Sequence, residues 1–155
     1  MSPPRVAARR YETLVPNCTV GIILPMPSSF VIILHTGRGP DHYDLMLEML
    51  ETGQALATWQ LQQDCLDLRP GEGLAARKLP DHRLAYLSHQ GPVSGGRGHV
   101  RRIHAGTYET LARGPDRLVL RLDSPGASAA FEFARTAEPG GAGDDWRITR
   151  ISLPC

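Results

Sequence analysis

Short apolar runs and apolar–polar alternation follow one another along the chain from residue 30 onward. Residues two apart on a strand share a face, so this alternation predicts half-buried strands. Glycine and proline separate the segments and mark turns, including a hairpin turn at 51–54. We expect strands at residues 30–34, 42–49, 55–61, 74–79, 83–87, 99–105, 107–112, 118–123, 129–135 and 146–153, with a brief helix within 60–68. This spacing is typical of a mainly β fold, an antiparallel β-barrel or sandwich.

The first 27 residues differ from the rest because they hold proline and arginine without a sustained period of either kind. This pattern is typical of an N-terminal extension that is disordered or loosely docked. A start of translation at Met26 is an alternative explanation of the same pattern. Residues 28–155 are predicted to form a single domain, since a chain of this length buries a core without disulfides or a structural metal.

Charge and cysteine usage narrow the classes of function. The formal net charge of +1 argues against binding nucleic acid mainly through bulk positive potential, although it allows a local basic patch. The three cysteines are far apart, which favours free thiols in a reducing compartment. The apolar run at 20–26 is too short to cross a bilayer, and residues 1–25 make a poor signal peptide. We therefore expect a cytoplasmic protein with no membrane partner.

A cluster of two histidines and an aspartate is the main candidate for chemistry. His35, His42 and Asp44 lie within ten residues, and His42 and Asp44 share a face of the predicted strand with Met46 and Glu48. The intervening residues would form the core face. Imidazole and carboxylate ligands suit manganese, zinc or iron. Glu48 lies about 13 Å along the strand from Asp44, so we expect it to support a histidine instead of joining the ligands. The competing interpretation is a polar loop before a half-buried strand.

Two further segments carry candidate chemistry. His82 and Tyr86 are four residues apart, which places them on one face of either a strand or a helical turn. An imidazole and a phenol together can bind a phosphate oxygen and stabilise a leaving group, but a core-edge tyrosine beside a surface histidine explains the spacing equally. The glycine-rich stretch at 91–98, which includes Arg97, either approaches a ligand closely or forms a turn before a basic strand.

Four segments together resemble the 3′-phosphoesterase domain of bacterial DNA ligase D, and more closely its small standalone bacterial relatives. They read FVIILH at 30–35, HYDLMLE at 42–48, DHRLAY at 81–86 and GPVSGGRG at 91–98. The resemblance covers about residues 28–153 and implies a compact antiparallel β-barrel with one or more short flanking helices. It also implies a Mn²⁺-dependent enzyme, with Zn²⁺ as the alternative metal, that removes a terminal ribonucleoside and then the 3′-phosphate in DNA end repair.

The resemblance also implies roles for individual residues and for partners. His35, His42 and Asp44 would hold the metal, while His82 and Tyr86 would contact the scissile phosphate as the catalytic pair. The substrate would be the 3′ end of DNA or of a DNA–RNA junction. Ligase or polymerase repair proteins would be the protein partners.

Departures from the family pattern affect the residues that grip phosphate. Met46 stands where the ligase family has an arginine that can bind phosphate bidentately, and a second such arginine aligns with Leu74. A glutamine of the family aligns with Ile33. Replacement charge would come from Arg97 first, then from Arg83, Arg77 or Lys78. We expect a metal-dependent phosphoesterase; the alternative is a non-catalytic or altered-specificity metal-binding module that recognises nucleic-acid ends or a repair partner.

Overall fold

The computed structural model describes residues 28–49, 55–136 and 144–153. The predicted extension at 1–27 and the predicted turn at 51–54 lie outside these ranges. Nine strands and two 3-10 turns follow in chain order: β1 (Ser28–Thr36), β2 (His42–Glu48), β3 (Ala55–Leu61), η1 (Cys65–Asp67), β4 (Gly73–Arg83), η2 (Leu84–Leu87), β5 (Gly91–Pro92), β6 (His99–Gly114), β7 (Arg117–Ser124), β8 (Ala127–Arg135) and β9 (Asp145–Ile151).

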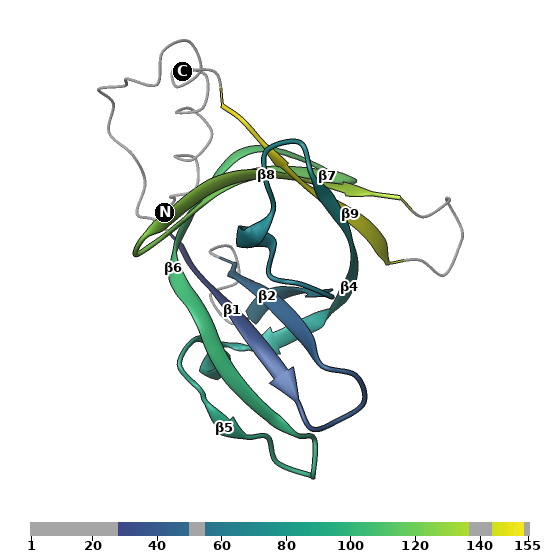
Figure 1. Cartoon of the computed structure of the whole chain (residues 1–155), viewed down its shortest axis with the longest axis vertical. Helices are drawn as coiled ribbons and strands as arrows, with labels where there is room; N and C mark the ends of the chain where they lie inside the picture. Colours follow the sequence, from purple (N-terminus) through teal and green to yellow (C-terminus); the bar gives the residue numbers. More distant parts are fainter. Residues whose placement is uncertain (1–27, 50–54, 137–143, 154–155) are drawn as a thin grey trace, which may run out of the picture.

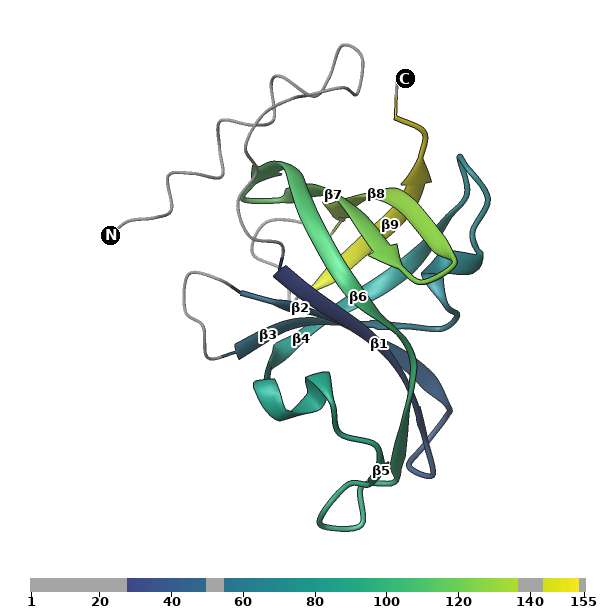
Figure 2. The same cartoon turned by 90° about the vertical axis from the view of Figure 1, so that its left-hand side faces the viewer.

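Eight of the strands close into an antiparallel barrel (Figures 1 and 2). Their order is β1-β2-β3-β4-β9-β8-β7-β6, and pairing between β1 and β6 closes the ring. The short strand β5 adds to the outer part of β6. Closure leaves the eight strands without an open edge, which removes the exposed hydrogen-bonding groups that promote aggregation. The predicted mainly β fold, an antiparallel β-barrel, is confirmed.

The barrel interior holds the main core. Alternate residues of each strand point inward, so the core draws on strands from every side of the ring. Its largest fully buried side chains include three phenylalanines and leucines, and Trp59 packs edge-on against Phe133 with ring centroids 4.9 Å apart. The inward residues of β1, β2, β3 and β8 are Phe30, Ile32, Leu45, Leu47, Ala57, Trp59, Leu61, Ala129, Phe131 and Phe133.

A second, smaller core covers the outer face of β1 and β2. Its members come from these strands, from β3 and from the chain around β5 and β6: Val31, Ile33, Met46, Leu56, Val93 and Val100. Both faces of β2 are therefore buried along its second half. The expectation that residues 42–49 have one apolar face and one polar face is wrong at Met46, which is only 1% exposed. The reason is tertiary, because η2 and the 91–98 loop fold back over this surface.

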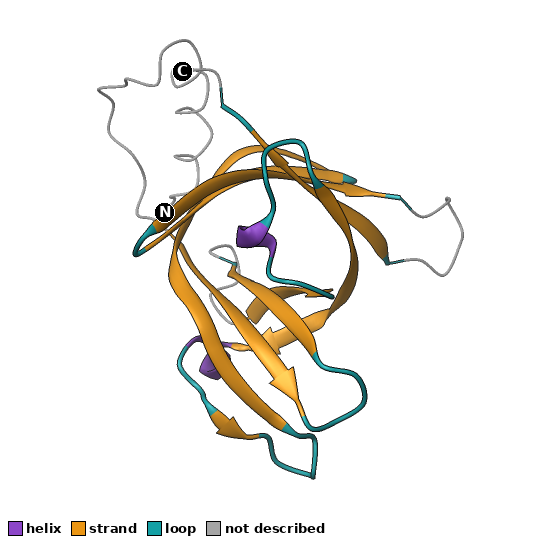
Figure 3. Cartoon of the chain, in the orientation of Figure 1, coloured by secondary structure: helices purple, strands orange, loops and turns teal. Residues whose placement is uncertain are grey.

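The two 3-10 turns, η1 and η2, differ from the elements that the sequence predicted at the same residues (Figure 3). Residues 84–87, expected as part of a strand, form the 3-10 turn η2, because Leu84, Tyr86 and Leu87 all pack on the second core and strand alternation would separate them. The helix expected within 60–68 is only the single turn η1, whose N-terminus is capped by Asp64. These turns match the expected short flanking helices. No helix among the described residues is long and apolar enough to cross a membrane.

Gly106 does not separate two strands as the sequence pattern suggested. β6 runs without a break from His99 to Gly114 and passes through this glycine. A Cβ atom at Gly106 would overlap the carbonyl oxygen of Asp123 on β7. The glycine therefore serves a close approach between the backbones of two paired strands, and the separate strands expected at 99–105 and 107–112 are one long strand.

Candidate metal centre

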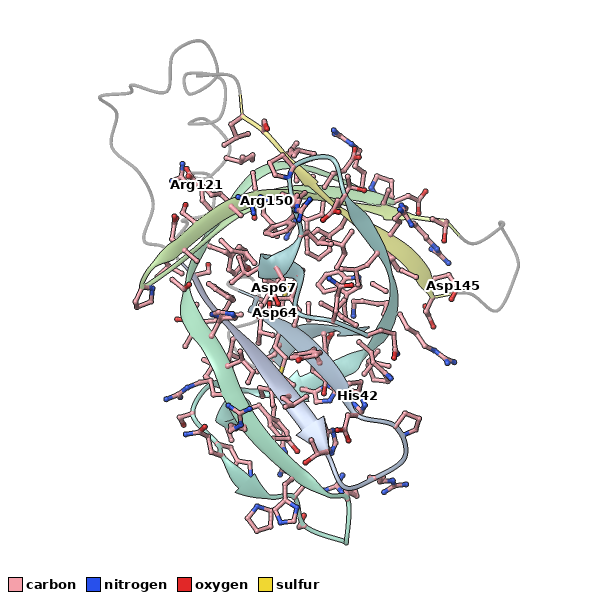
Figure 4. All side chains as sticks on the ribbon, viewed as in Figure 1. His42, Asp64, Asp67, Arg121, Asp145 and Arg150 are labelled. Atoms are coloured by element: carbon pink, nitrogen blue, oxygen red, sulfur yellow. The ribbon has the colours of Figure 1, made fainter. Side chains whose placement is uncertain are left out.

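Strand pairing brings the predicted metal ligands together. His35 near the end of β1 lies directly opposite His42 at the start of β2, and Asp44 follows two residues later on the same face of β2. This face is the outer side of the barrel, next to the second core. Figure 4 shows His42 at the end of the hairpin, apart from Asp64 and Asp67 in the middle of the view. A short loop between the two strands is therefore sufficient to build the cluster.

Three side chains converge at distances that suit a metal ion. His35 Nδ1 lies 3.8 Å from Asp44 Oδ2, and His42 Nε2 lies 3.5 Å from Asp44 Oδ1. Two atoms that each lie about 2.1 Å from one ion are at most about 4.2 Å apart, so both contacts are within that limit. One ligand atom from each of the three residues lies within 4.8 Å of the others, so the side chains need to close by a few tenths of an ångström to hold one ion. The two imidazole rings are tilted by 56° with centroids 4.9 Å apart.

Backbone carbonyl groups select which imidazole nitrogen faces the cluster. His35 Nε2 lies 2.6 Å from the carbonyl oxygen of Arg97, and His42 Nδ1 lies 3.2 Å from that of Pro40. A carbonyl oxygen only accepts, so each neutral imidazole places its single N–H there. The lone pairs of His35 Nδ1 and His42 Nε2 are then left for a cation. This is the arrangement in which a hydrogen bond orients a histidine ligand.

Asp44 is a buried carboxyl group without enough partners. Its side chain is 5% exposed, and its Oδ1 atom has no hydrogen-bond partner among the described residues. Burial is the largest influence on the pKa of this carboxyl and raises it, while positive charge on His42 and then His82 opposes the rise. A buried carboxylate oxygen that is unpaired in a cluster of imidazole lone pairs fits a site for a divalent cation.

The predicted catalytic pair is assembled next to this cluster. The rings of His82 and Tyr86 meet edge to face with centroids 5.6 Å apart. His82 Nδ1 lies 2.9 Å from the carbonyl oxygen of Pro80, so its Nε2 atom remains available. Positive charge on His82 lowers the pKa of the Asp44 carboxyl, against the larger rise caused by burial. His82 reaches this surface from the end of β4, where its backbone pairs with Leu56.

The glycine-rich loop reaches the metal cluster through its backbone. Gly98 has φ = +87°, and a Cβ atom there would overlap the carbonyl oxygen of Thr36, next to His35. This close contact holds Arg97 O against the His35 ring. The guanidinium group of Arg97 turns away to its own loop, where it donates to the carbonyl oxygen of Ser94 at 2.7 Å and to the Ser94 hydroxyl at 3.1 Å.

The other predicted site residues are more distant from the cluster. Glu48 lies at the far end of β2, where its Oε1 atom accepts a hydrogen bond of 3.0 Å from Ser29 N, and no contact joins it to a histidine among the described residues. Arg83 lines a cavity beside Tyr86. Lys78 lies over the ring of Trp59, 5.2 Å from its centroid, and is paired with Asp81.

The register of the sheet reveals a basic residue on the same face as Asp44. Asp44 pairs with Gln60 on β3, and Gln60 pairs with the exposed Arg77 on β4, so the three residues form one row across the outer face. Leu74, in contrast, is buried in the main core on the inner face. A side chain at position 74 therefore points away from the metal cluster. Arg77 is the arginine of β4 that lies on the same face of the sheet as Asp44.

The pair formed by Asp64 and His104 was not predicted from the sequence. His104 Nε2 lies 2.6 Å from Asp64 Oδ2, and the other carboxylate oxygen accepts from Leu66 N at 2.9 Å. The pair fastens η1 to β6 inside the barrel. The only local signal was an aspartate placed to cap a short helix, because the histidine lies 40 residues later.

No protein-family model matches the chain, and the search of curated proteins found no match. A function therefore has to be inferred from the chemistry of the site. Among the described residues, the site combines a buried carboxylate whose Oδ1 atom accepts no hydrogen bond, two oriented imidazoles and a His–Tyr pair.

Proposed function

We propose that this chain is a metal-dependent phosphoesterase that processes the 3′ end of DNA or of a DNA–RNA junction in DNA end repair. The observation that carries this proposal is the convergence of His35, His42 and Asp44. Carbonyl groups orient both imidazoles, and buried Asp44 Oδ1 has no hydrogen-bond partner in the part of the chain that the structure describes. The resemblance to the 3′-phosphoesterase domain of DNA ligase D supports the choice of substrate.

The metal would be held by His35 Nδ1, His42 Nε2 and the Asp44 carboxylate. Nitrogen and carboxylate ligands suit Mn²⁺ or Zn²⁺. When bound, such an ion polarises a phosphoryl oxygen and lowers the pKa of a bound water. The carbonyl oxygens of Arg97 and Pro40 keep both imidazoles in the orientation that binding requires. The pair β1–β2 holds this set rigidly because both strands are paired on either side in the closed barrel.

His82 and Tyr86 would act on the phosphate ester itself. The Nδ1 atom of His82 is engaged by Pro80 O, so a protonated imidazole would present Nε2–H to a phosphoryl oxygen or to the leaving oxygen. The Tyr86 hydroxyl would donate a second hydrogen bond to the charge that develops on the same group. The edge-to-face contact of the two rings keeps both polar groups at one place on the surface.

Arg77 would supply the positive charge for phosphate binding. It is exposed and lies in the row with Gln60 and Asp44, whereas the guanidinium of Arg97 is engaged by Ser94. A guanidinium group binds phosphate oxygens with two parallel hydrogen bonds. Arg77 would therefore replace, from two strands away on β4, the charge that the family carries at the position of Met46.

A second function is supported by Met46. This residue is buried in the second core and faces Val31 across the β1–β2 pair, so it leaves no room for a phosphate-binding group at its position. A non-catalytic module that binds metal and recognises nucleic-acid ends or a repair partner would tolerate this change. The two functions differ in whether a substrate is consumed.

A turnover assay separates them. Purified protein is incubated with Mn²⁺ and a labelled primer–template that ends in a 3′-phosphate or in a 3′-ribonucleotide, beside His42→Ala and His99→Ala variants. We expect shortening or dephosphorylation with the native protein and with His99→Ala, because His99 is exposed and outside the cluster. We expect the activity of His42→Ala to fall by about 100-fold or more, since a lost ligand removes the metal.

The results of this assay distinguish the phosphoesterase from the non-catalytic binding module. Product that forms equally with His42→Ala contradicts the metal centre as the active site. No product with any protein, although one equivalent of metal is bound, favours the binding module. An Arg77→Ala variant with a raised KM and an unchanged kcat supports its role in ground-state phosphate binding, and an unchanged KM removes that role.

A further inference from the structure

An open cavity lies beside Tyr86, and His82 is not among its lining residues. Its volume is about 230 Å³, and its walls come from η2 and from the loop around β5: Arg83, Ala85, Tyr86, His89, Pro92, Val93 and Ser94. These two segments lie together beside the lower part of the barrel in Figure 2. None of these residues belongs to the metal cluster, so the cavity is a separate feature that shares one wall with the proposed catalytic pair.

Contacts through Tyr86 and through the 91–98 loop connect the cavity to the metal centre. The Tyr86 ring meets His82 on one side and His89 on the other, with centroids 5.6 Å and 5.8 Å apart. Val93 N donates to the carbonyl oxygen of Gly98 at 2.8 Å, and Gly98 adjoins the residue whose carbonyl oxygen contacts His35. A ligand in the cavity would therefore lie one aromatic ring away from a phosphate bound at His82.

The lining favours a flat, neutral ring over an anion. Tyr86 and His89 supply ring surfaces, while Ala85, Pro92 and Val93 supply apolar contacts. Arg83 is the only charged residue in the wall. The cavity is smaller than the roughly 300–1,000 Å³ clefts that hold drug-sized molecules, so it suits a single ring system and not a whole nucleotide. Proteins that bind unpaired nucleotides use such aromatic surfaces to stack bases.

We propose that this cavity binds the nucleobase of the terminal nucleotide, while its 3′-phosphate lies at His82 and the metal centre. This inference rests on the proposed function and adds that the enzyme takes an unpaired, base-bearing end. His89 Nε2 is 3.0 Å from Pro92 O, which fixes the imidazole as part of the wall. The Arg83 guanidinium at the same wall can stack on the base or donate to an acceptor on its edge.

The test compares two 3′ ends that differ only in the terminal base. A fluorescently labelled primer–template ends either in a normal nucleotide or in an abasic analogue, each with a non-hydrolysable phosphonate in place of the 3′-phosphate, and binding is followed by fluorescence anisotropy with Mn²⁺ present. Stacking of one base on an aromatic side chain strengthens binding, so the native protein should bind the base-bearing end about 10-fold more tightly. Ala85→Leu, which fills the cavity from an exposed position of η2, should reduce this preference to about 1-fold.

Ser88→Leu is the matched control, because Ser88 is an exposed residue that follows η2 and does not line the cavity. It should keep the full preference for the base-bearing end. Equal affinity of the native protein for the two ends, or a preference that survives Ala85→Leu, overturns the base site. Binding too weak to measure at either end also overturns it. Turnover in the Mn²⁺ assay without a base preference would remove this inference and leave the proposed function intact, whereas a base preference without turnover would do the reverse.

Discussion

The Nε2 atom of His35 lies 2.6 Å from the backbone carbonyl oxygen of Arg97, which is 62 residues later in the chain. This contact joins the metal cluster on β1 and β2 to the glycine-rich loop. A neutral His35 places its N–H on this carbonyl oxygen, which leaves the lone pair of Nδ1 on the side of Asp44. The loop therefore contributes to metal binding through its backbone, without a side chain at the metal.

Gly98→Ala should weaken metal binding although Gly98 is not a ligand. A Cβ atom would overlap Thr36 O, so the loop must move and withdraw the carbonyl oxygen of Arg97 from His35. Loss of a partner that orients a histidine ligand costs about 10–100-fold in metal affinity. Isothermal titration calorimetry with Mn²⁺ measures this loss of metal affinity. Gly96→Ala is the control, since Gly96 has a similar positive φ but no atom within 4 Å of the added Cβ. Equal affinities of the two variants would contradict the proposed coupling.

Met46→Arg should destabilise the protein and should not restore phosphate binding. The side chain of Met46 is buried among Val31, Ile33 and Leu56, so an arginine there would be an uncompensated buried charge. We expect a loss of about 3–5 kcal/mol in the free energy of unfolding, measured with urea. Met46→Leu keeps the volume and should lose less than about 1.5 kcal/mol. An arginine variant that is as stable as the native protein and turns over substrate faster would show that this position opens toward the site.

Asp44 should give the metal-free protein a characteristic dependence of stability on pH. Burial raises the pKa of its carboxyl above the ordinary value, so in the window between the two values the folded protein binds more protons than the unfolded chain. Its contribution to the free energy of unfolding is therefore present at low pH and is lost as pH rises through this window. Metal affinity should change in the opposite direction, because only the ionised carboxylate binds the cation.

Urea denaturation in EDTA at a series of pH values measures the first trend, with Asp44→Asn as the comparison. The difference in unfolding free energy between native protein and variant should change with pH only within the window. A difference that is constant with pH would contradict the raised pKa of Asp44.

Asp64→Ala should be strongly destabilising, because Asp64 is a buried residue that caps η1. The carboxylate of Asp64 is buried and accepts from both His104 Nε2 and Leu66 N, so its removal leaves two donors without a partner. We expect a loss of about 3 kcal/mol in the free energy of unfolding. Asp67→Ala, at an exposed position of the same turn, should change it by less than about 0.5 kcal/mol. Similar losses from the two variants would remove the pair as an anchor of η1.

The sequence predicted the mainly β architecture because strand alternation and turn residues are local signals. The pairing of His35 with His42 could also be predicted from the sequence, since a short hairpin places its two ends side by side. Elements that depend on contacts between residues far apart in the sequence could not be predicted in this way. The turn η2 forms because three of its side chains reach the second core, and Gly106 is needed for its approach to Asp123 on the next strand.

The sequence likewise predicted the metal ligands but not the residues around them. Its ligands are close in sequence, but the groups that orient and surround them are not. Arg97 was expected to grip phosphate with its guanidinium group, and instead its carbonyl oxygen contacts His35. Arg77 joins the face of Asp44 only through the register of two strand pairs, which spacing along the chain does not reveal.

The most direct test of the metal centre is the stoichiometry of bound metal. Native protein, His42→Ala and His99→Ala are each dialysed against Mn²⁺, freed of excess metal and analysed for metal content. We expect close to one ion per chain for the native protein and for His99→Ala, and almost none for His42→Ala. A native protein that retains no ion, or a His42→Ala variant that retains a full equivalent, would contradict the assignment of His35, His42 and Asp44 as a metal-binding site.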